Sequence, residues 1–196
     1  MSQQLIPGYT YGTHEVPRSP VTIEEFELLK QAVLFTDEDA RHLQLSEKVL
    51  EDQVEAVLDV WYGFIGSLPQ LLYYFTRPDG QADGAYLAAV RKRFAQWIRD
   101  TARANYDQSW LDYQYEIGLR HHRTGKNTTD HVNSVANIGF RYLFPLIFPV
   151  TITLKPFLAK KGHSAEVVEK MQQAWVKSLL LQITLWSQPY IKPGDF

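Results

Sequence analysis

Apolar side chains recur every three to four residues along most of the chain, and this period constrains the fold more than any other feature. One run consists of Leu50, Val54, Val57, Leu58, Trp61, Tyr62 and Ile65. A second consists of Leu87, Val90, Phe94, Trp97 and Ile98. Such spacing places side chains on one face of an α-helix, whereas the residues of a strand would alternate with a period of two. The pattern therefore predicts an all-α protein.

Local signals indicate where further helices begin and end. Thr22 precedes an apolar run and has a glutamate three residues later, which is the pattern of a capping box, and Thr36 begins a second such signal. A helix is predicted from about residue 106 to residue 122. A final helix is predicted from Ser164, whose capping signal is only partial, to Trp186.

Three stretches lack a simple helical period. Residues 1–20 are rich in Gly, Pro and Tyr and are expected to form an extended arm. Residues 67–80, SLPQLLYYFTRPDG, end in Pro-Asp-Gly and are expected to form a turn region. Residues 134–158 are expected to form one long apolar element despite Pro145 and Pro149.

The length and the charge of the chain narrow its class. Its 196 residues suit one domain, residues 1–196, in which we expect seven or eight helices. The net charge of -2 argues against a general nucleic-acid binder, which would carry a basic excess. The absence of cysteine excludes disulfides, thiolate metal ligands and cysteine nucleophiles.

The sequence contains no evident export or membrane segment. The N-terminal MSQQLIPGYTYG has neither the basic nor the apolar region of a secretory signal. The most apolar segment, YLFPLIFPVTITL, is too short to span a bilayer. We therefore expect a soluble, cytoplasmic protein that makes no membrane contact.

The final predicted helix is apolar around most of its circumference. Its apolar residues include Met171, Trp175, Leu179, Leu180, Leu181, Ile183, Leu185 and Trp186. One face of such a helix covers the core, and another needs a second partner. Self-association through this helix and the apolar element before it gives a two-fold homodimer. A central helix in the core of a monomer is the alternative.

The histidine pair His121 and His122 is the remaining candidate for chemistry. Phosphate-binding loops, HExxH motifs and nucleophile elbows are absent from the sequence. Neighbouring residues of a helix point about 100° apart, so the pair cannot hold one ion together. His121 shares the apolar face of Leu111 and Gly118, whereas His122 turns to solvent. His121 is then either a buried histidine bonded to a backbone carbonyl or the single axial ligand of a haem, which the many aromatic residues would suit.

The sequence resembles the protoglobins, single-domain relatives of the globin module in globin-coupled sensors. The resemblance covers essentially the whole chain and is most specific around LRHHR. It is carried by IPGYTYG (6–12), VLEDQV (49–54), WYGF (61–64), LLYYF (71–75), YLAAVRKRF (86–94), WLDYQYEIGLRHHR (110–123), KPFLAKKGH (155–163) and WSQPYIKPGDF (186–196).

This resemblance implies a globin-like 3-over-3 helical sandwich with an extra N-terminal helix, binding haem b. His121 would be the proximal iron ligand, with His122 a non-ligand neighbour, and Arg93 would hold a haem propionate. A five-coordinate iron would leave its sixth position to O2, CO or NO, with the Tyr62 hydroxyl as a hydrogen-bond donor. The family's distal wall corresponds to Trp61, Tyr62, Leu87, Val90, Phe94, Leu143, Leu146 and Val150.

The sequence departs from the family pattern at Pro145 and Leu146. A small residue is expected in place of Pro145 and an aromatic residue in place of Leu146. A proline inside a helix costs ~3 kcal/mol, and Leu146 would open the distal side. Natural divergence and deliberate reshaping of the pocket both stay open. So do two other functions: a haem enzyme (NO dioxygenase, peroxidase-like or carbene transferase) and a gas-sensing module.

Overall fold

A computed structural model describes residues 6–196, which form eight α-helices and no strand. The all-α prediction is therefore confirmed for this part of the chain. The elements are α1 (Ile23–Ala32), α2 (Asp37–Leu50), α3 (Val54–Ser67), α4 (Pro69–Leu72), η1 (Tyr73–Phe75), α5 (Gly84–Arg103), α6 (Gln108–His121), η2 (Phe140–Tyr142), α7 (Ile147–Leu158), η3 (Ala159–Lys161), α8 (Ala165–Ser187) and η4 (Gln188–Tyr190).

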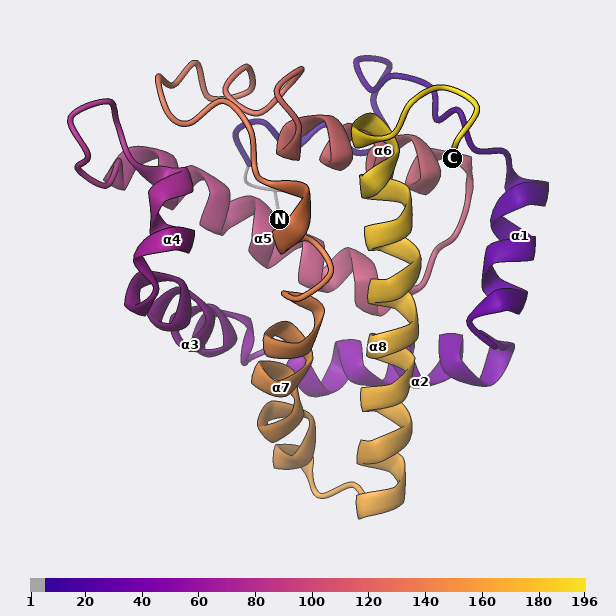
Figure 1. Ribbon diagram of the computed structural model, residues 1–196. Helices are drawn as coiled ribbons and strands as arrows, with labels where there is room; N and C mark the ends of the chain where they lie inside the picture. The colour runs from indigo at the N-terminus through magenta and orange to yellow at the C-terminus, as the bar shows by residue number, and fades with distance from the viewer. Residues whose placement is uncertain (1–5) are drawn as a thin grey trace.

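Helix α8 is central to the packing. It contacts α2, α6 and α7, while α3 contacts α5 and α7. α7 and α8 lie side by side and run in opposite directions, and α1 stands at the edge of the molecule (Figure 1). The helices α2, α5 and α6 thus form one layer and α3, α7 and α8 the other. This is the expected 3-over-3 sandwich, with α1 as the additional N-terminal helix.

Three helices begin where the sequence places a cap. The Thr22 and Thr36 side chains accept hydrogen bonds from the third backbone amide of α1 and α2, and both sites form complete capping boxes. The Ser164 hydroxyl accepts from the Val167 amide at 3.3 Å without a returning acidic side chain, as the partial signal predicted. A cap of this kind contributes about 1 kcal/mol to stability.

Two boundaries near the first periodic segment differ from the sequence expectation. Leu50 ends α2, and a turn over residues 51–53 separates it from α3, so the apolar run spans two helices rather than one. The expected turn region 67–80 contains α4 and η1, which begin at Pro69. Proline is well suited to the first turn of a helix, where its missing N–H needs no partner.

The apolar segment 134–158 is not one long element. Its α-helix begins only at Ile147, after the short η2 and a turn. Pro145 therefore lies ahead of the helix, and the cost of an interior proline does not arise there. Pro149 lies in the first turn of α7, and Pro156 lies in its interior.

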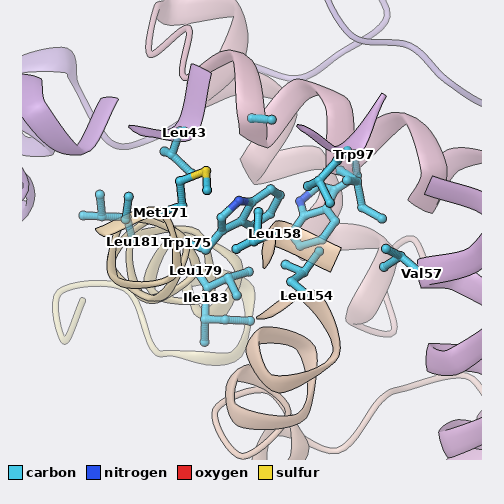
Figure 2. Packing of buried hydrophobic residues seen from close by; sticks show 14 of the residues in the cluster. Leu43, Val57, Trp97, Leu154, Leu158, Met171, Trp175, Leu179, Leu181 and Ile183 are labelled. Atoms are coloured by element: carbon cyan, nitrogen blue, oxygen red, sulfur yellow. The ribbon is translucent and has the colours of Figure 1, made fainter. Parts of the chain in front are cut away.

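The core lies where α2, α5, α7 and α8 meet. Trp97 and Trp175 pack there in an edge-on pair, among leucines from α2, α7 and α8 (Figure 2). Each indole N–H has a buried acceptor: Trp97 donates to Gln182 Oε1 at 2.6 Å, and Trp175 donates to Ser46 Oγ at 2.9 Å. Because buried indole N–H groups need such partners, these bonds fix the orientation of both rings.

The N-terminal arm, described from Ile6, runs through a series of turns to Pro20; residues 1–5 of the expected arm lie outside the described residues. It is fastened to α5 and α6 by several hydrogen bonds, three of which involve Pro7, Gly8 and Tyr9. The Tyr9 hydroxyl donates to Asp100 at 2.6 Å, Arg93 donates to the Pro7 carbonyl at 2.9 Å, and Arg120 donates to the Gly8 carbonyl at 2.6 Å. Gly8 has a φ of +73°, and a Cβ there would lie 2.5 Å from Thr129, so a larger residue does not fit.

The helical stretch Phe140–Lys161 is longer than the apolar segment recognised in the sequence. Its 22 residues have a mean hydropathy of 1.5, enough to cross a membrane by length and composition, and 28% of its most apolar window is buried. The stretch is a candidate by length and composition alone, and its α-helical part, α7, has 12 residues. Within the stretch, α7 packs against α3 and α8, as a helix of a globular core does.

Candidate ligand-binding cavity

An apolar cavity of about 260 Å³ lies among α3, α5, α6, α7 and α8. Nine of the ten predicted site residues line it: Trp61, Tyr62, Val90, Arg93, Phe94, His121, Leu143, Leu146 and Val150. Leu87 does not line the cavity, and its helix presents the preceding residue, Tyr86, instead. The structure thus brings together residues that are up to 89 positions apart in the sequence, from Trp61 to Val150.

His121, the last residue of α6, borders the cavity. Its Nδ1 lies 2.8 Å from the carbonyl oxygen of Ile117. A carbonyl oxygen only accepts, so Nδ1 carries the proton and Nε2 keeps its lone pair. Burial lowers the pKa of His121 below its usual value, which favours the neutral ring. The His121 ring thus makes the hydrogen bond to a backbone carbonyl that is expected of a buried histidine. The same ring keeps its second nitrogen, Nε2, free to bind a metal.

His122 lies outside the cavity lining, as helical spacing predicted. Its Nδ1 is 3.1 Å from the Thr124 hydroxyl, and its ring packs edge-on against Tyr190. The backbone of His122 is already extended, because α6 ends at the residue before it. The two neighbouring histidines therefore have different surroundings.

Trp186 of α8 holds the His121 ring from one side. The two rings are stacked, with centroids 5.2 Å apart and an angle of 16° between planes. The Trp186 indole donates to Gln114 Oε1 at 2.8 Å, which fixes the indole in turn. Since Ile117 and Gln114 are both on α6, the orientation of His121 depends on how closely α6 and α8 approach.

That approach requires Gly118. A Cβ at this position would lie 3.0 Å from the Cα and the carbonyl oxygen of Trp186, which are backbone atoms that cannot move aside independently. Gly118→Ala is therefore expected to lower the free energy of unfolding by about 1–3 kcal/mol, the usual cost of overpacking. Urea denaturation followed by circular dichroism measures it. Gly63→Ala is the matched control, because a Cβ there meets nothing within 4 Å; equal stabilities of the two variants would contradict the prediction.

Aromatic residues from α3 and α5 form another wall of the cavity. Phe94 packs edge-on against both Trp61 and Tyr62, at 5.9 Å and 6.4 Å between ring centroids. Burial raises the pKa of Tyr62, so its hydroxyl keeps its proton and remains a hydrogen-bond donor. Val90 carries no polar atom. Tyr62 is the hydroxyl donor that the sequence predicted for this wall.

Arg93 is already paired. It forms two hydrogen bonds with Asp130, at 2.9 Å and 2.5 Å, in addition to its bond to the arm. The other arginine at this edge of the cavity, Arg120, pairs with Glu116 at 2.7 Å. A haem propionate expected at Arg93 would therefore compete with Asp130 for the guanidinium.

Several lining residues were missed by sequence reasoning. Tyr74, Lys126, Asp130 and Tyr142 border the cavity and belong to η1, η2 or the loop between α6 and η2. These segments have no helical period, so nothing in the pattern indicates which of their side chains point inward. Trp186 was recognised as apolar but not as a neighbour of His121.

The two-layered helical sandwich, with an apolar cavity and a single imidazole at its wall, defines a globin-type protein. Among solved structures it is similar to the globin domain of the Geobacter sulfurreducens globin-coupled sensor, with a TM-score of 0.67 over 88% of this chain and 99% of that chain. At 19% sequence identity this likeness shows the fold alone. The chain belongs to the Protoglobin family, whose model matches residues 22–195. No curated protein sequence matches it.

Membership of this family implies a haem cofactor and haem-based gas binding in general. The residues of the cavity fit such a group. A haem needs apolar walls and one neutral imidazole with an available nitrogen. The aromatic residues of α3 and α5 supply the walls, and His121 supplies the nitrogen because its other nitrogen is committed to Ile117.

Proposed function

We propose that the chain is a haem b protein that reversibly binds O2, CO and NO, with His121 as the proximal ligand of a five-coordinate iron. The bond from His121 Nδ1 to the Ile117 carbonyl carries the proposal, because it fixes the tautomer in which Nε2 is free to bind a metal. Haem b supplies the iron at which a diatomic gas binds.

The side chains of the cavity have separate tasks in this proposal. Ile117 and Trp186 orient the His121 ring, and the carbonyl bond strengthens its Nε2 as a ligand. Trp61, Phe94 and Leu146 exclude water from the cavity. The Tyr62 hydroxyl donates a hydrogen bond to a polar gas molecule held in the cavity.

The optical spectrum of the protein tests the proposal directly. After reconstitution with haem, we expect a Soret band that shifts on reduction with dithionite and shifts again when CO is added. A reconstituted sample without a Soret band would refute haem binding. A ferrous spectrum with two axial protein ligands would refute five-coordination while leaving haem binding intact.

Tyr62→Phe is expected to speed the dissociation of O2 roughly tenfold, since one hydrogen bond to a polarised group contributes about 1–3 kcal/mol. CO carries less charge, so its dissociation should change less. Stopped-flow displacement of O2 by CO measures both rates. Tyr73→Phe removes a hydroxyl from an exposed side chain and serves as the control. An O2 dissociation rate that is the same in both variants would show that Tyr62 does not contact the ligand.

We further propose that the protein is a cytoplasmic homodimer that associates through α7 and α8. Large apolar side chains are exposed at intervals of four residues on η2, the following turn and α7: Phe140, Phe144, Phe148 and Ile152. Leu180 is exposed on the neighbouring α8. A row of exposed apolar side chains on two adjacent helices favours association with a second copy, and a two-fold axis buries the same row on both chains.

A further inference from the structure

A buried lysine lies at the polar edge of the cavity. Lys126, in the loop after α6, is 3% exposed and lines the cavity. Its Nζ donates to the carbonyl oxygen of Tyr74 at 2.9 Å and lies 5.1 Å from the centre of the Tyr86 ring. The side chain is therefore fixed in place by two elements, η1 and α5.

Lys126 differs from the other cations of this edge in having no carboxylate partner. Arg93 pairs with Asp130, and Arg120 pairs with Glu116. Within residues 6–196, no Asp or Glu side chain lies within 4.0 Å of Lys126 Nζ. An ammonium group has three N–H donors, and the Tyr74 carbonyl takes one of them.

The charge of Asp130 acts on Lys126 only from beyond 4.0 Å, and Asp130 is already bonded to Arg93. A buried ammonium without a counter-charge in contact is unfavourable, and a carboxylate in hydrogen-bond contact removes the penalty. Burial lowers the pKa of Lys126 to about 8, so the side chain still carries its proton at pH 7. The remainder of the cavity is lined mainly by aromatic and aliphatic side chains. A ligand that suits both parts is flat and apolar and has an acidic group on one edge.

We propose that Lys126 recognises a haem propionate carboxylate through its free ammonium donors, in place of Arg93. The inference rests on the proposed haem function and adds to it the residue that binds the acidic edge of the porphyrin. Arg93 keeps a structural task, since it joins Asp130 to the N-terminal arm. The two roles follow from the partners that each cation already has.

Metal-free protoporphyrin IX and its dimethyl ester test this inference without any contribution from an iron–histidine bond. Both are titrated into the full chain freed of haem, and binding is followed by the quenching of tryptophan fluorescence, which Trp61, Trp97 and Trp186 report from the cavity wall. We expect the unaltered chain to bind the diacid about tenfold or more tightly than the ester, the usual gain from one charged hydrogen bond. In Lys126→Met this ratio should fall close to one, with the affinity for the ester retained.

Lys92→Met, which removes an exposed lysine on α5, should keep the ratio of the unaltered chain. Circular dichroism checks the fold of each variant, and Lys126→Gln carries the same comparison if the methionine variant does not fold. An unchanged ratio in the Lys126 variants overturns the inference. Loss of binding of both porphyrins by a folded Lys126 variant also overturns it, because the lysine would then shape the cavity rather than read a carboxylate. An unaltered chain that binds neither porphyrin also overturns the inference, and the optical spectrum of the haem-reconstituted protein then decides the proposed haem function separately.

Discussion

Replacing His121 by alanine is expected to abolish the five-coordinate ferrous spectrum completely. The substitution removes an imidazole that borders the cavity, together with its side-chain hydrogen bond to the Ile117 carbonyl. No neighbouring residue replaces the ligand, because His122 is turned toward Thr124 and Tyr190. Absorption spectra of the reduced, haem-reconstituted variant measure the loss, and added imidazole should restore a histidine-like spectrum by occupying the space that alanine leaves.

His122→Ala provides the matched control for this experiment. It removes the same side chain one position along the chain, from a site outside the cavity lining. Its reduced and CO-bound spectra should be nearly those of the unaltered protein. If His122→Ala loses the ferrous spectrum and His121→Ala keeps it, the assignment of the proximal ligand from helical facing is wrong.

Phe148→Asp is expected to convert the proposed dimer to a monomer. Phe148 is 69% exposed and lies in the middle of the row formed by Phe140, Phe144 and Ile152. A two-fold interface would bury this side chain twice, and each burial of a phenylalanine contributes about 1.5–3 kcal/mol. The dissociation constant should therefore rise by about 100-fold or more. Sedimentation equilibrium over a range of concentrations measures it.

The effect of Phe148→Asp must be compared with the effect of an aspartate substitution elsewhere on the surface. Leu28 of α1 is 64% exposed and lies outside the row, so Leu28→Asp should leave the dimer intact. Phe148 is not part of the cavity lining, and the haem spectrum of the monomeric variant should stay unchanged. A Phe148→Asp protein that is still dimeric would place the interface on another face.

Much of the fold follows from the sequence because helix formation is governed by near neighbours. The caps at Thr22, Thr36 and Ser164 and the apolar period locate most helices to within a few residues. The exception at Pro145 has a physical reason. A proline is equally compatible with an interrupted helix and with a chain that has yet to enter one, and only the packing of α7 distinguishes the two.

The cavity was less predictable than the helices. On α5 the lining includes Val90, Phe94 and Trp97 of the apolar run, but Tyr86 takes the place expected for Leu87. A hydrophobic period locates a face only to within the width of one side chain, so Leu87 and Tyr86 are hard to separate. Lys126 had no pattern to reveal it, because its place depends on a loop that meets Tyr74 and Tyr86 in space.

The fastening of the N-terminal arm has a consequence for the order in which the molecule is assembled. The bonds of Pro7, Gly8 and Tyr9 reach partners 86 to 112 positions later, whereas most contacts in a helical protein are local. Closing such long loops costs chain entropy that is repaid only after α5 and α6 are in place. We therefore expect the arm to dock late during synthesis, although it is synthesised before α5 and α6. Until then Arg93 and Arg120, which line the cavity, lack the arm carbonyls that hold their guanidinium groups in the folded chain.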